Sequence, residues 1–115
     1  MNRHMDKKSI IANKDKAHEI IMYLHAALHR HGVTPCNIAL FGSFLHGNNH
    51  PESDLDIIII SEKFEDRNFD ERFKMTRLAE REVRKKYIVP MDILMKTPQE
   101  YNDPQRKMFE SKIII

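Results

Sequence analysis

Cysteine, glycine and tryptophan are scarce in this chain. Its 115 residues include one cysteine, three glycines and no tryptophan. The single cysteine, Cys36, excludes an internal disulfide and a zinc site built from cysteines, and it fits a reducing compartment. No apolar run approaches the roughly 18 residues of a membrane span, and residues 1–8 lack the apolar centre of a signal peptide. We therefore expect a cytoplasmic protein that has no membrane partner.

A strong excess of charge is missing as well. The chain carries 19 basic and 17 acidic residues, which gives a net charge of +2 with neutral histidines. This balance is too even to indicate nucleic acid or an anionic membrane, so no nucleic-acid partner is expected. The length suits one small domain, over residues 1–115, and leaves no room for a second hydrophobic core.

Apolar periodicity predicts a small mixed α/β (α+β) sheet packed with helices. Helices are expected over residues 14–30 and 70–86, and strands over residues 37–41, 54–60 and 87–95. The second strand is apolar on both faces over residues 57–60, which is typical of a central strand. Pro90 lacks a backbone donor, so the third strand is expected at an edge of the sheet or at a bulge.

Two further expectations concern the second helix and the end of the chain. The helix is expected to turn six apolar side chains toward the core, namely Phe69, Phe73, Met75, Leu78, Ala79 and Val83. A short helix is expected over residues 104–112. The three isoleucines at 113–115 are expected either to pack back on the domain or to meet a partner.

Aspartates mark two of the predicted strands. Asp54 and Asp56 are one residue apart at the start of the central strand, so their side chains point the same way. Asp92 lies in the third strand. A carboxylate among apolar strand residues needs a cationic partner, a solvated strand end or a bound metal. Magnesium and manganese prefer carboxylate oxygens, and the three aspartates together favour a metal over separate ion pairs.

A small polar turn precedes this carboxylate pair. Gly42 and Ser43 follow the first strand, and ten residues separate Ser43 from Asp54. Glycine and serine form many ordinary turns, but such a turn also lets phosphate oxygens approach backbone amides beside a hydroxyl donor. A Walker loop is excluded because its Lys-Ser or Lys-Thr ending is missing.

This order of residues resembles the signature of the DNA polymerase β-like nucleotidyltransferase superfamily. The resemblance covers residues 37–95, and the short length makes the chain similar to minimal nucleotidyltransferases, the MNT antitoxins that pair with HEPN-domain toxins. It implies a nucleotidyltransferase fold with two Mg²⁺ ions, or Mn²⁺, held by Asp54, Asp56 and Asp92. It also implies that Gly42 and Ser43 bind the phosphates of the nucleotide substrate, which is expected to be ATP.

The resemblance further implies transfer of a nucleoside monophosphate, here AMP from ATP, to a hydroxyl of a partner protein. In this interpretation the partner is a HEPN-type toxin and the chain is its antitoxin. Two metal ions would stabilise the attacking and leaving oxygens, while Asp92 would help to deprotonate the acceptor hydroxyl. Larger relatives carry a second domain that holds the acceptor. Here a partner chain, or a second copy in a homo-oligomer, would have to complete the site.

Several alternatives stay open. The acceptor could be a small molecule similar to an aminoglycoside, or the chain could be a binding module without catalysis. Many relatives carry a basic residue in the turn, where this chain has Phe44, Leu45 and His46. Separately, His18, His25 and His29 share one arc of the first helix. His25 and His29 have the spacing of a zinc pair, but a solvated polar face is the preferred interpretation because no further ligand lies nearby in sequence.

Overall fold

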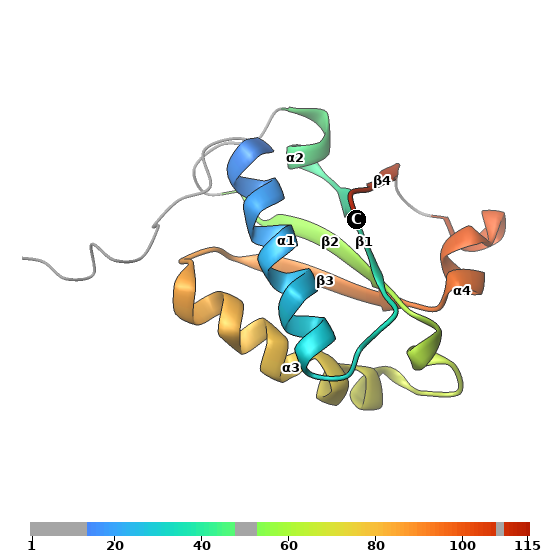
Figure 1. Ribbon diagram of the computed structural model, residues 1–115. Coiled ribbons are helices and arrows are strands. Elements are labelled where there is room, and N and C mark those ends of the chain that lie inside the picture. The colour runs from blue at the N-terminus through green and yellow to red at the C-terminus, as the bar shows by residue number, and fades with distance from the viewer. Residues whose placement is uncertain (1–13, 48–52, 108–109) are drawn as a thin grey trace, which may run out of the picture.

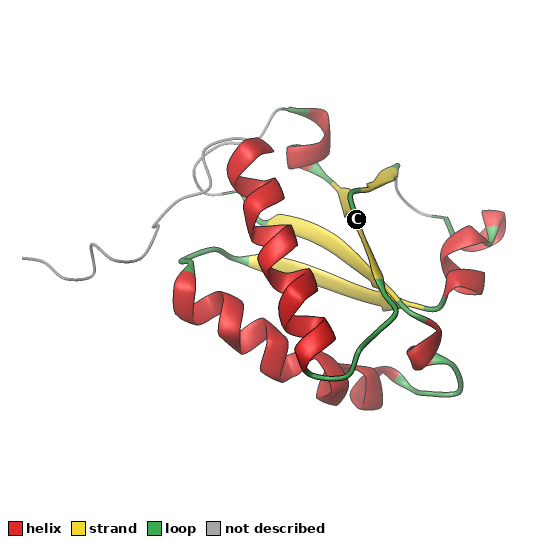
Figure 2. Ribbon diagram, in the orientation of Figure 1, coloured by secondary structure: helices red, strands yellow, loops and turns green. Residues whose placement is uncertain are grey.

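The computed structural model describes residues 14–47, 53–107 and 110–115. The described elements are, in chain order, α1 (Lys14–Arg30), β1 (Asn37–Phe41), α2 (Ser43–His46), β2 (Leu55–Ile60), η2 (Glu62–Phe64), α3 (Phe69–Lys86), β3 (Met91–Lys96), α4 (Pro98–Asn102), η3 (Pro104–Arg106) and β4 (Ser111–Ile113). The strands form one mixed sheet in the order β3-β2-β1-β4, in which β2 runs parallel to β3 and the other pairs are antiparallel. Helices α1 and α3 lie together on one side of this sheet (Figures 1 and 2).

Helix α1 supplies much of the main core. The predicted bounds of this helix and of the first strand are confirmed. The apolar stripe of α1 is fully buried at Ala17, Ile20, Ile21, Leu24, Ala27 and Leu28. These side chains share one core with Ile38 of β1 and Ile57 of β2. None of the described helices is long and apolar enough to cross a membrane.

Strand β2 is central, as its sequence predicts, and begins one residue later than expected. Ile57 and Ile59 join the core under α1 and α3. Ile58 and Ile60 belong to a second cluster with Ala39 and Phe41, and they are also buried. Because alternate strand residues point to opposite faces, the two clusters identify the two faces of the sheet. The face of Ile58 and Ile60 is called the second face below.

Strand β3 lies at one edge of the sheet, which confirms the position that Pro90 indicates. The predicted start at Tyr87 is wrong, because the strand begins at Met91. The backbone N–H of Tyr87 still donates to the carbonyl of Val83 in the last turn of α3. Pro90 has no N–H, yet its carbonyl accepts a hydrogen bond of 2.8 Å from Leu55, so regular pairing starts just after the proline.

The buried face of α3 differs from the prediction. Phe69, Phe73 and Leu78 are exposed, by 67%, 45% and 45% respectively. Thr76 and Glu80 are buried in their place, together with the correctly predicted Ala79 and Val83 and the partly buried Met75. The hydroxyl of Thr76 donates to the carboxylate of Glu80 over 2.8 Å, and Arg84 also reaches Glu80. Because Thr76 and Glu80 form a hydrogen bond with each other, both can be buried. A prediction based on apolar residues alone therefore assigns the wrong side of α3 to the core.

The end of the chain also corrects the prediction. The prediction of one helix over residues 104–112 is wrong. The described part of that range contains only the short 3-10 helix η3, at residues 104–106, and the start of β4, and α4 lies before it at residues 98–102. Thr97 and Glu100 form a capping box that starts α4 at Pro98. The isoleucine tail packs back on the domain. Strand β4 pairs with β1, and Ile38 exchanges backbone hydrogen bonds of 2.8 Å and 2.9 Å with Ile114 and Ile115.

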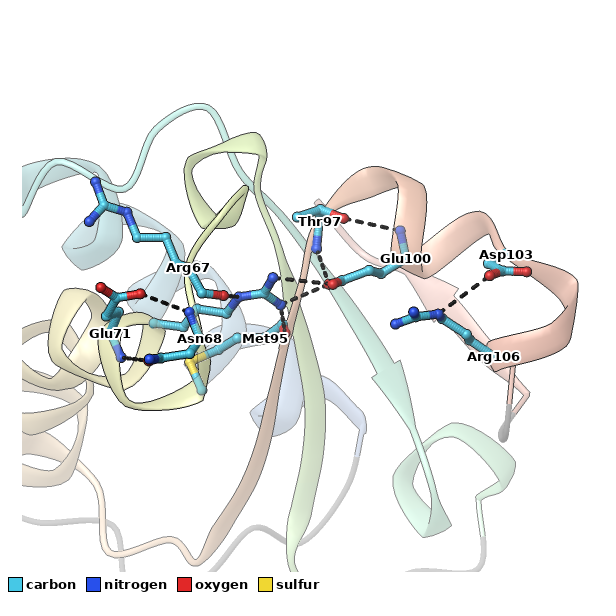
Figure 3. Close-up of polar contacts among 9 residues, drawn as sticks. Arg67, Asn68, Glu71, Met95, Thr97, Glu100, Asp103 and Arg106 are labelled. Carbon is cyan, nitrogen blue, oxygen red and sulfur yellow. Dashed lines mark hydrogen bonds and ion pairs between the residues drawn. The ribbon is translucent and has the colours of Figure 1, made fainter.

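Arg72 ties three elements together at the far end of β3. Its guanidinium donates to the carbonyl of Met95 over 3.0 Å and to both carboxylate oxygens of Glu100 over 2.7 Å and 3.1 Å. Its Nε donates to the carbonyl of Arg67 over 2.9 Å (Figure 3). This hydrogen bonding from Arg72, with help from the Thr97 amide, lowers the pKa of Glu100 from 4.5 to about 2.

We predict that Glu100→Gln lowers the free energy of unfolding at pH 7 by about 1.5–3 kcal/mol, the range for hydrogen bonds to charged groups. A depressed pKa in the folded state means that the contribution is present above pH 4.5 and is lost as the pH falls toward 2. Urea unfolding at pH 7 and near pH 2.5 tests this. Glu65→Gln, which alters an exposed carboxylate, is the control. If the loss of unfolding free energy in Glu100→Gln is the same at both pH values, the stabilising role of the ionised Glu100 carboxylate is contradicted.

Candidate functional site

Strand pairing brings the predicted site residues together at one end of the strands, where β2 and β3 begin and β1 ends. In the parallel pair, Asp56 of β2 lies opposite Asp92 of β3. In the antiparallel pair, Asp56 lies opposite Phe41, the last residue of β1. Gly42 and Ser43 follow Phe41 directly, so the turn adjoins Asp56. Asp56 is two residues from Ile58 and therefore points to the second face, away from α1 and α3.

Gly42 is in close contact with Asp56. Its φ is +77°, in the region that favours glycine, and a Cβ built there would lie 2.1 Å from Oδ2 of Asp56. No side chain can therefore occupy position 42 while Asp56 keeps its place. A ligand bound here could therefore contact both the backbone of the turn and the carboxylate of Asp56.

The short helix α2 holds the turn in position. Phe44 is fully buried in the main core, which anchors the residue just after Ser43. The amides of Leu45 and His46 donate to the carbonyl of Gly42 over 3.1 Å and 3.3 Å. Phe44 thus has a structural role in the turn. Nε2 of His46 lies 3.5 Å from Oε1 of Glu110, and both side chains are exposed.

Negative charge is concentrated at this end of the strands. Burial, followed by the charges of Asp92 and Asp54, raises the pKa of Asp56 from 3.8 to about 6. Asp54 and Asp92 are exposed. Among the described residues, none of the three carboxylates forms an ion pair with a lysine, arginine or histidine. The ion-pair explanation of these aspartates therefore finds no support, whereas a solvated strand end fits Asp54 and Asp92.

The donor set fits a hard divalent cation. Carboxylate oxygens suit Mg²⁺ and Mn²⁺, and Mg²⁺ commonly takes one or two protein carboxylates and completes its shell with water and substrate phosphates. Within residues 14–47, 53–107 and 110–115, no three histidine, cysteine or acidic side chains converge as placed into a ready ligand set. Asp54 and Asp92 lie close enough to Asp56 for their charges to raise its pKa, but water and phosphate would have to complete the coordination.

The histidines of α1 do not form a common site. Nε2 of His25 is 3.0 Å from the carbonyl of Cys36, and Nδ1 of His29 is 3.1 Å from the hydroxyl of Thr34. His18 is exposed and lines a separate hollow with Asp15. The zinc-pair interpretation therefore gains no support, because His25 and His29 contact different parts of the loop after α1.

Comparison with known proteins supports the fold. No curated protein sequence matches the chain. In structure, it is similar to a candidate nucleotidyltransferase from Sulfolobus solfataricus, with a TM-score of 0.55, 15% sequence identity and 84% of each chain covered. At this identity the likeness concerns the fold alone, and it confirms the predicted nucleotidyltransferase fold.

A family profile gives the sequence-level result. The profile described as a nucleotidyltransferase domain matches residues 22–115, which extend from α1 to the last residue. The match includes the turn at Gly42 and all three aspartates. On this basis the chain belongs to the nucleotidyltransferase domain family, whose general activity is nucleotidyl transfer.

Proposed function

We propose that this nucleotidyltransferase is metal-dependent and transfers AMP from ATP to a hydroxyl group of a partner protein. The observation that carries the proposal is the close contact between Gly42 and Asp56. Asp56 also lies opposite Asp92 in the pairing of β2 with β3. This arrangement puts a turn suited to phosphate next to carboxylates suited to a divalent cation. Phosphoryl transfer needs little more from the protein than positioning and charge stabilisation.

Each site residue then has a role. Asp54 and Asp56 would hold Mg²⁺ or Mn²⁺, with Asp92 completing the ligands of two ions. The bound metal would neutralise phosphate charge and act as a Lewis acid. The backbone of Gly42 and the amide and hydroxyl of Ser43 would bind the β- and γ-phosphates.

The proposed transfer makes one bond and breaks one. The acceptor oxygen bonds to the α-phosphorus, the bond from that phosphorus to the bridging oxygen of the β-phosphate breaks, and pyrophosphate leaves past Ser43. The carboxylate of Asp92 takes the proton of the acceptor hydroxyl. Asp92 is exposed and therefore accessible to an acceptor that belongs to another molecule.

The outer surface of α3 supports a protein as partner. Four exposed cations follow one stripe of this helix, at Lys74, Arg77, Arg81 and Lys85. None of them forms an ion pair within the described part of the chain. Phe69, Phe73 and Leu78 are exposed on the same helix. Aromatic side chains and arginine are enriched at protein interfaces, so this surface fits a partner with acidic and apolar groups.

A HEPN-type toxin is the partner that we propose, with this chain as its antitoxin. The assignment depends on the resemblance of the turn and the three aspartates to MNT proteins. A second copy of the chain could also take part in the complex. A small-molecule acceptor is the alternative within the same chemistry. A binding module that acts through the isoleucine tail is less well supported, since β4 uses that tail to pair with β1.

Labelling from ATP tests the reaction. The chain is incubated with Mg²⁺, α-labelled ATP and the product of the adjacent reading frame, which we expect to become labelled. In Asp54→Asn/Asp56→Asn the label should fall by more than about 10²-fold, as after loss of a group that stabilises transition-state charge. Glu62→Gln/Glu65→Gln removes two exposed carboxylates and should label normally. Labelling of a small molecule alone would favour the alternative acceptor. If the aspartate variant still neutralises the toxicity of the partner protein, a binding module would be favoured.

Gly42→Ala separates site geometry from backbone strain. Its Cβ would displace the Asp56 carboxylate, so we expect activity to fall by about 10²-fold or more. The positive φ adds a stability cost on the order of 1–3 kcal/mol. Gly47→Ala is the matched control, because Gly47 has the same φ of +77° and nothing within 4 Å of its Cβ. It should lose stability and retain activity. Equal activity losses in both variants would contradict the role of the Gly42–Asp56 contact.

Charge reversal tests the partner surface. We expect Arg77→Glu/Arg81→Glu to weaken the complex with the adjacent gene product by about tenfold or more, chiefly through a slower association rate that depends on salt. Surface plasmon resonance at two ionic strengths measures this. Lys63→Glu/Lys112→Glu reverses two exposed charges outside α3 and should bind as the wild type does. An equal loss in both variants would point to net charge and not to α3.

A further inference from the structure

The outer edge of β3 carries backbone groups that the sheet does not use. β3 is the last strand on its side of the sheet (Figure 1). The amide of Leu55 on β2 donates to the carbonyl of Pro90 over 2.8 Å, which sets the alternation along β3. Because alternate residues of a strand bond to the same neighbour, the even-numbered residues of β3 bond to β2. The odd-numbered residues direct their N–H and C=O groups outward, namely Met91, Ile93 and Met95.

Only the first part of this edge is available. The carbonyl of Met95 accepts a hydrogen bond of 3.0 Å from the guanidinium of Arg72. Within the part of the chain that the structure describes, no group bonds to the outward N–H or C=O of Met91 or Ile93. Both residues are half-buried, and Asp92 between them is exposed. The open edge is therefore short and is centred on Asp92.

This open edge has the geometry to accept one antiparallel strand. Two residues of such a strand would exchange hydrogen bonds with Met91 and Ile93, and the residue between them would lie opposite Asp92. Opposite residues in a pair of this kind have Cα atoms about 4.5 Å apart and side chains on the same face. Asp92 lies opposite Asp56 and so points to the second face with it. The added side chain would therefore lie beside the carboxylates of the candidate site.

A second copy of the chain does not suit this edge. Antiparallel self-pairing through Met91 and Ile93 would put Asp92 directly opposite the second copy's Asp92, and like charges in that arrangement are destabilising. Self-pairing centred on Ile93 instead would need the carbonyl of Met95, which already accepts from Arg72. The edge therefore favours a segment of a different protein, without an acidic side chain at the central position.

The position of the edge also favours the partner protein. Helix α3 ends at Lys86 and leads into β3 at Met91, so a partner on the exposed cations of α3 would already lie near this edge. The opposite edge of the sheet is β4, three strands from Asp92, or about 14 Å. A segment added at β4 would be too far away to place a side chain beside Asp92.

We propose that the open edge of β3 binds an extended segment of the partner protein as an antiparallel strand, with a hydroxyl-bearing residue opposite Asp92. The inference rests on the proposed function, because it identifies this segment as the acceptor. Backbone hydrogen bonds to Met91 and Ile93 supply affinity, while the position opposite Asp92 supplies specificity. A hydroxyl there can donate to the Asp92 carboxylate, whereas an acidic side chain would be repelled.

Amide hydrogen exchange tests the added strand. It is followed residue by residue by NMR in the full chain, alone and saturated with the product of the adjacent reading frame. In the free chain, we expect the amides of Met91 and Ile93 to exchange faster than those of Asp92 and Leu94, which bond to β2. In the complex, exchange at Met91 and Ile93 should slow by about tenfold or more, and exchange at Asp92 and Leu94 should change less.

A proline substitution tests the same hydrogen bonds by affinity. Ile93→Pro removes an outward N–H and leaves the bonds to β2 in place, as is typical of proline on an edge strand. We expect it to weaken binding of the adjacent gene product by about tenfold or more in surface plasmon resonance. Ile93→Ala is the matched control, because it shortens the same side chain and keeps the N–H. Equal affinities of the two variants would overturn the inference.

The outcomes separate this inference from the proposed function. If exchange at Met91 and Ile93 is unchanged in a complex that is still labelled from ATP, the added strand is overturned and the proposed function stands. This result does not depend on whether Ile93→Pro folds. Protection without labelling would overturn the transfer and keep the added strand, and absence of a complex would overturn both. Protection that rises with the concentration of the chain alone would assign the edge to a second copy and overturn the inference.

Discussion

The register between β1 and β2 is the constraint on which the candidate site depends. It pairs Phe41 with Asp56 and thereby brings Gly42 against the Asp56 carboxylate. A slip of one residue would turn every side chain of β2 to the other face and bury Asp56 under the helices. Leu55 and Asp56 oppose such a slip, because Leu55 is fully buried in the core on the helix side and a slip would put the Asp56 carboxylate in its place. The apolar core thus fixes the geometry of the polar site.

Under the proposed function, stability and catalysis would oppose each other at Asp56. Its raised pKa means that the folded protein favours the protonated carboxyl, whose stabilisation is complete below the ordinary value of 3.8. That stabilisation is lost as the pH rises through about 6, where the folded protein must carry the charge beside Asp54 and Asp92. The three carboxylates have no cationic partner among the described residues. Such unfavourable arrangements of charge are common at functional sites, where they lower stability.

The sequence predicted the parts of the fold that depend on local patterns. The bounds of α1 and β1, the central place of β2 and the edge place of β3 all follow from periodicity and from Pro90. The face of α3 could not be predicted this way, since Thr76 and Glu80 are buried through their mutual hydrogen bond. The turn and the three aspartates could be selected from spacing and residue type. The contact between Gly42 and Asp56 could not, because it depends on the register between β1 and β2.

The C-terminal segment and α3 divide the remaining tasks around the sheet. The segment after β3 returns to β1, pairs with it as β4 and carries Tyr101 onto the second face. It therefore covers the β1 and β2 part of that face. Helix α3 packs near β3 on the other side, and its last turn leads through Pro90 to Met91, next to Asp92 (Figure 1). Under the proposed function, a partner on the basic stripe of α3 would lie close to the β3 edge. Its hydroxyl could then reach Asp92 from that edge while the nucleotide phosphates lie at the turn after β1.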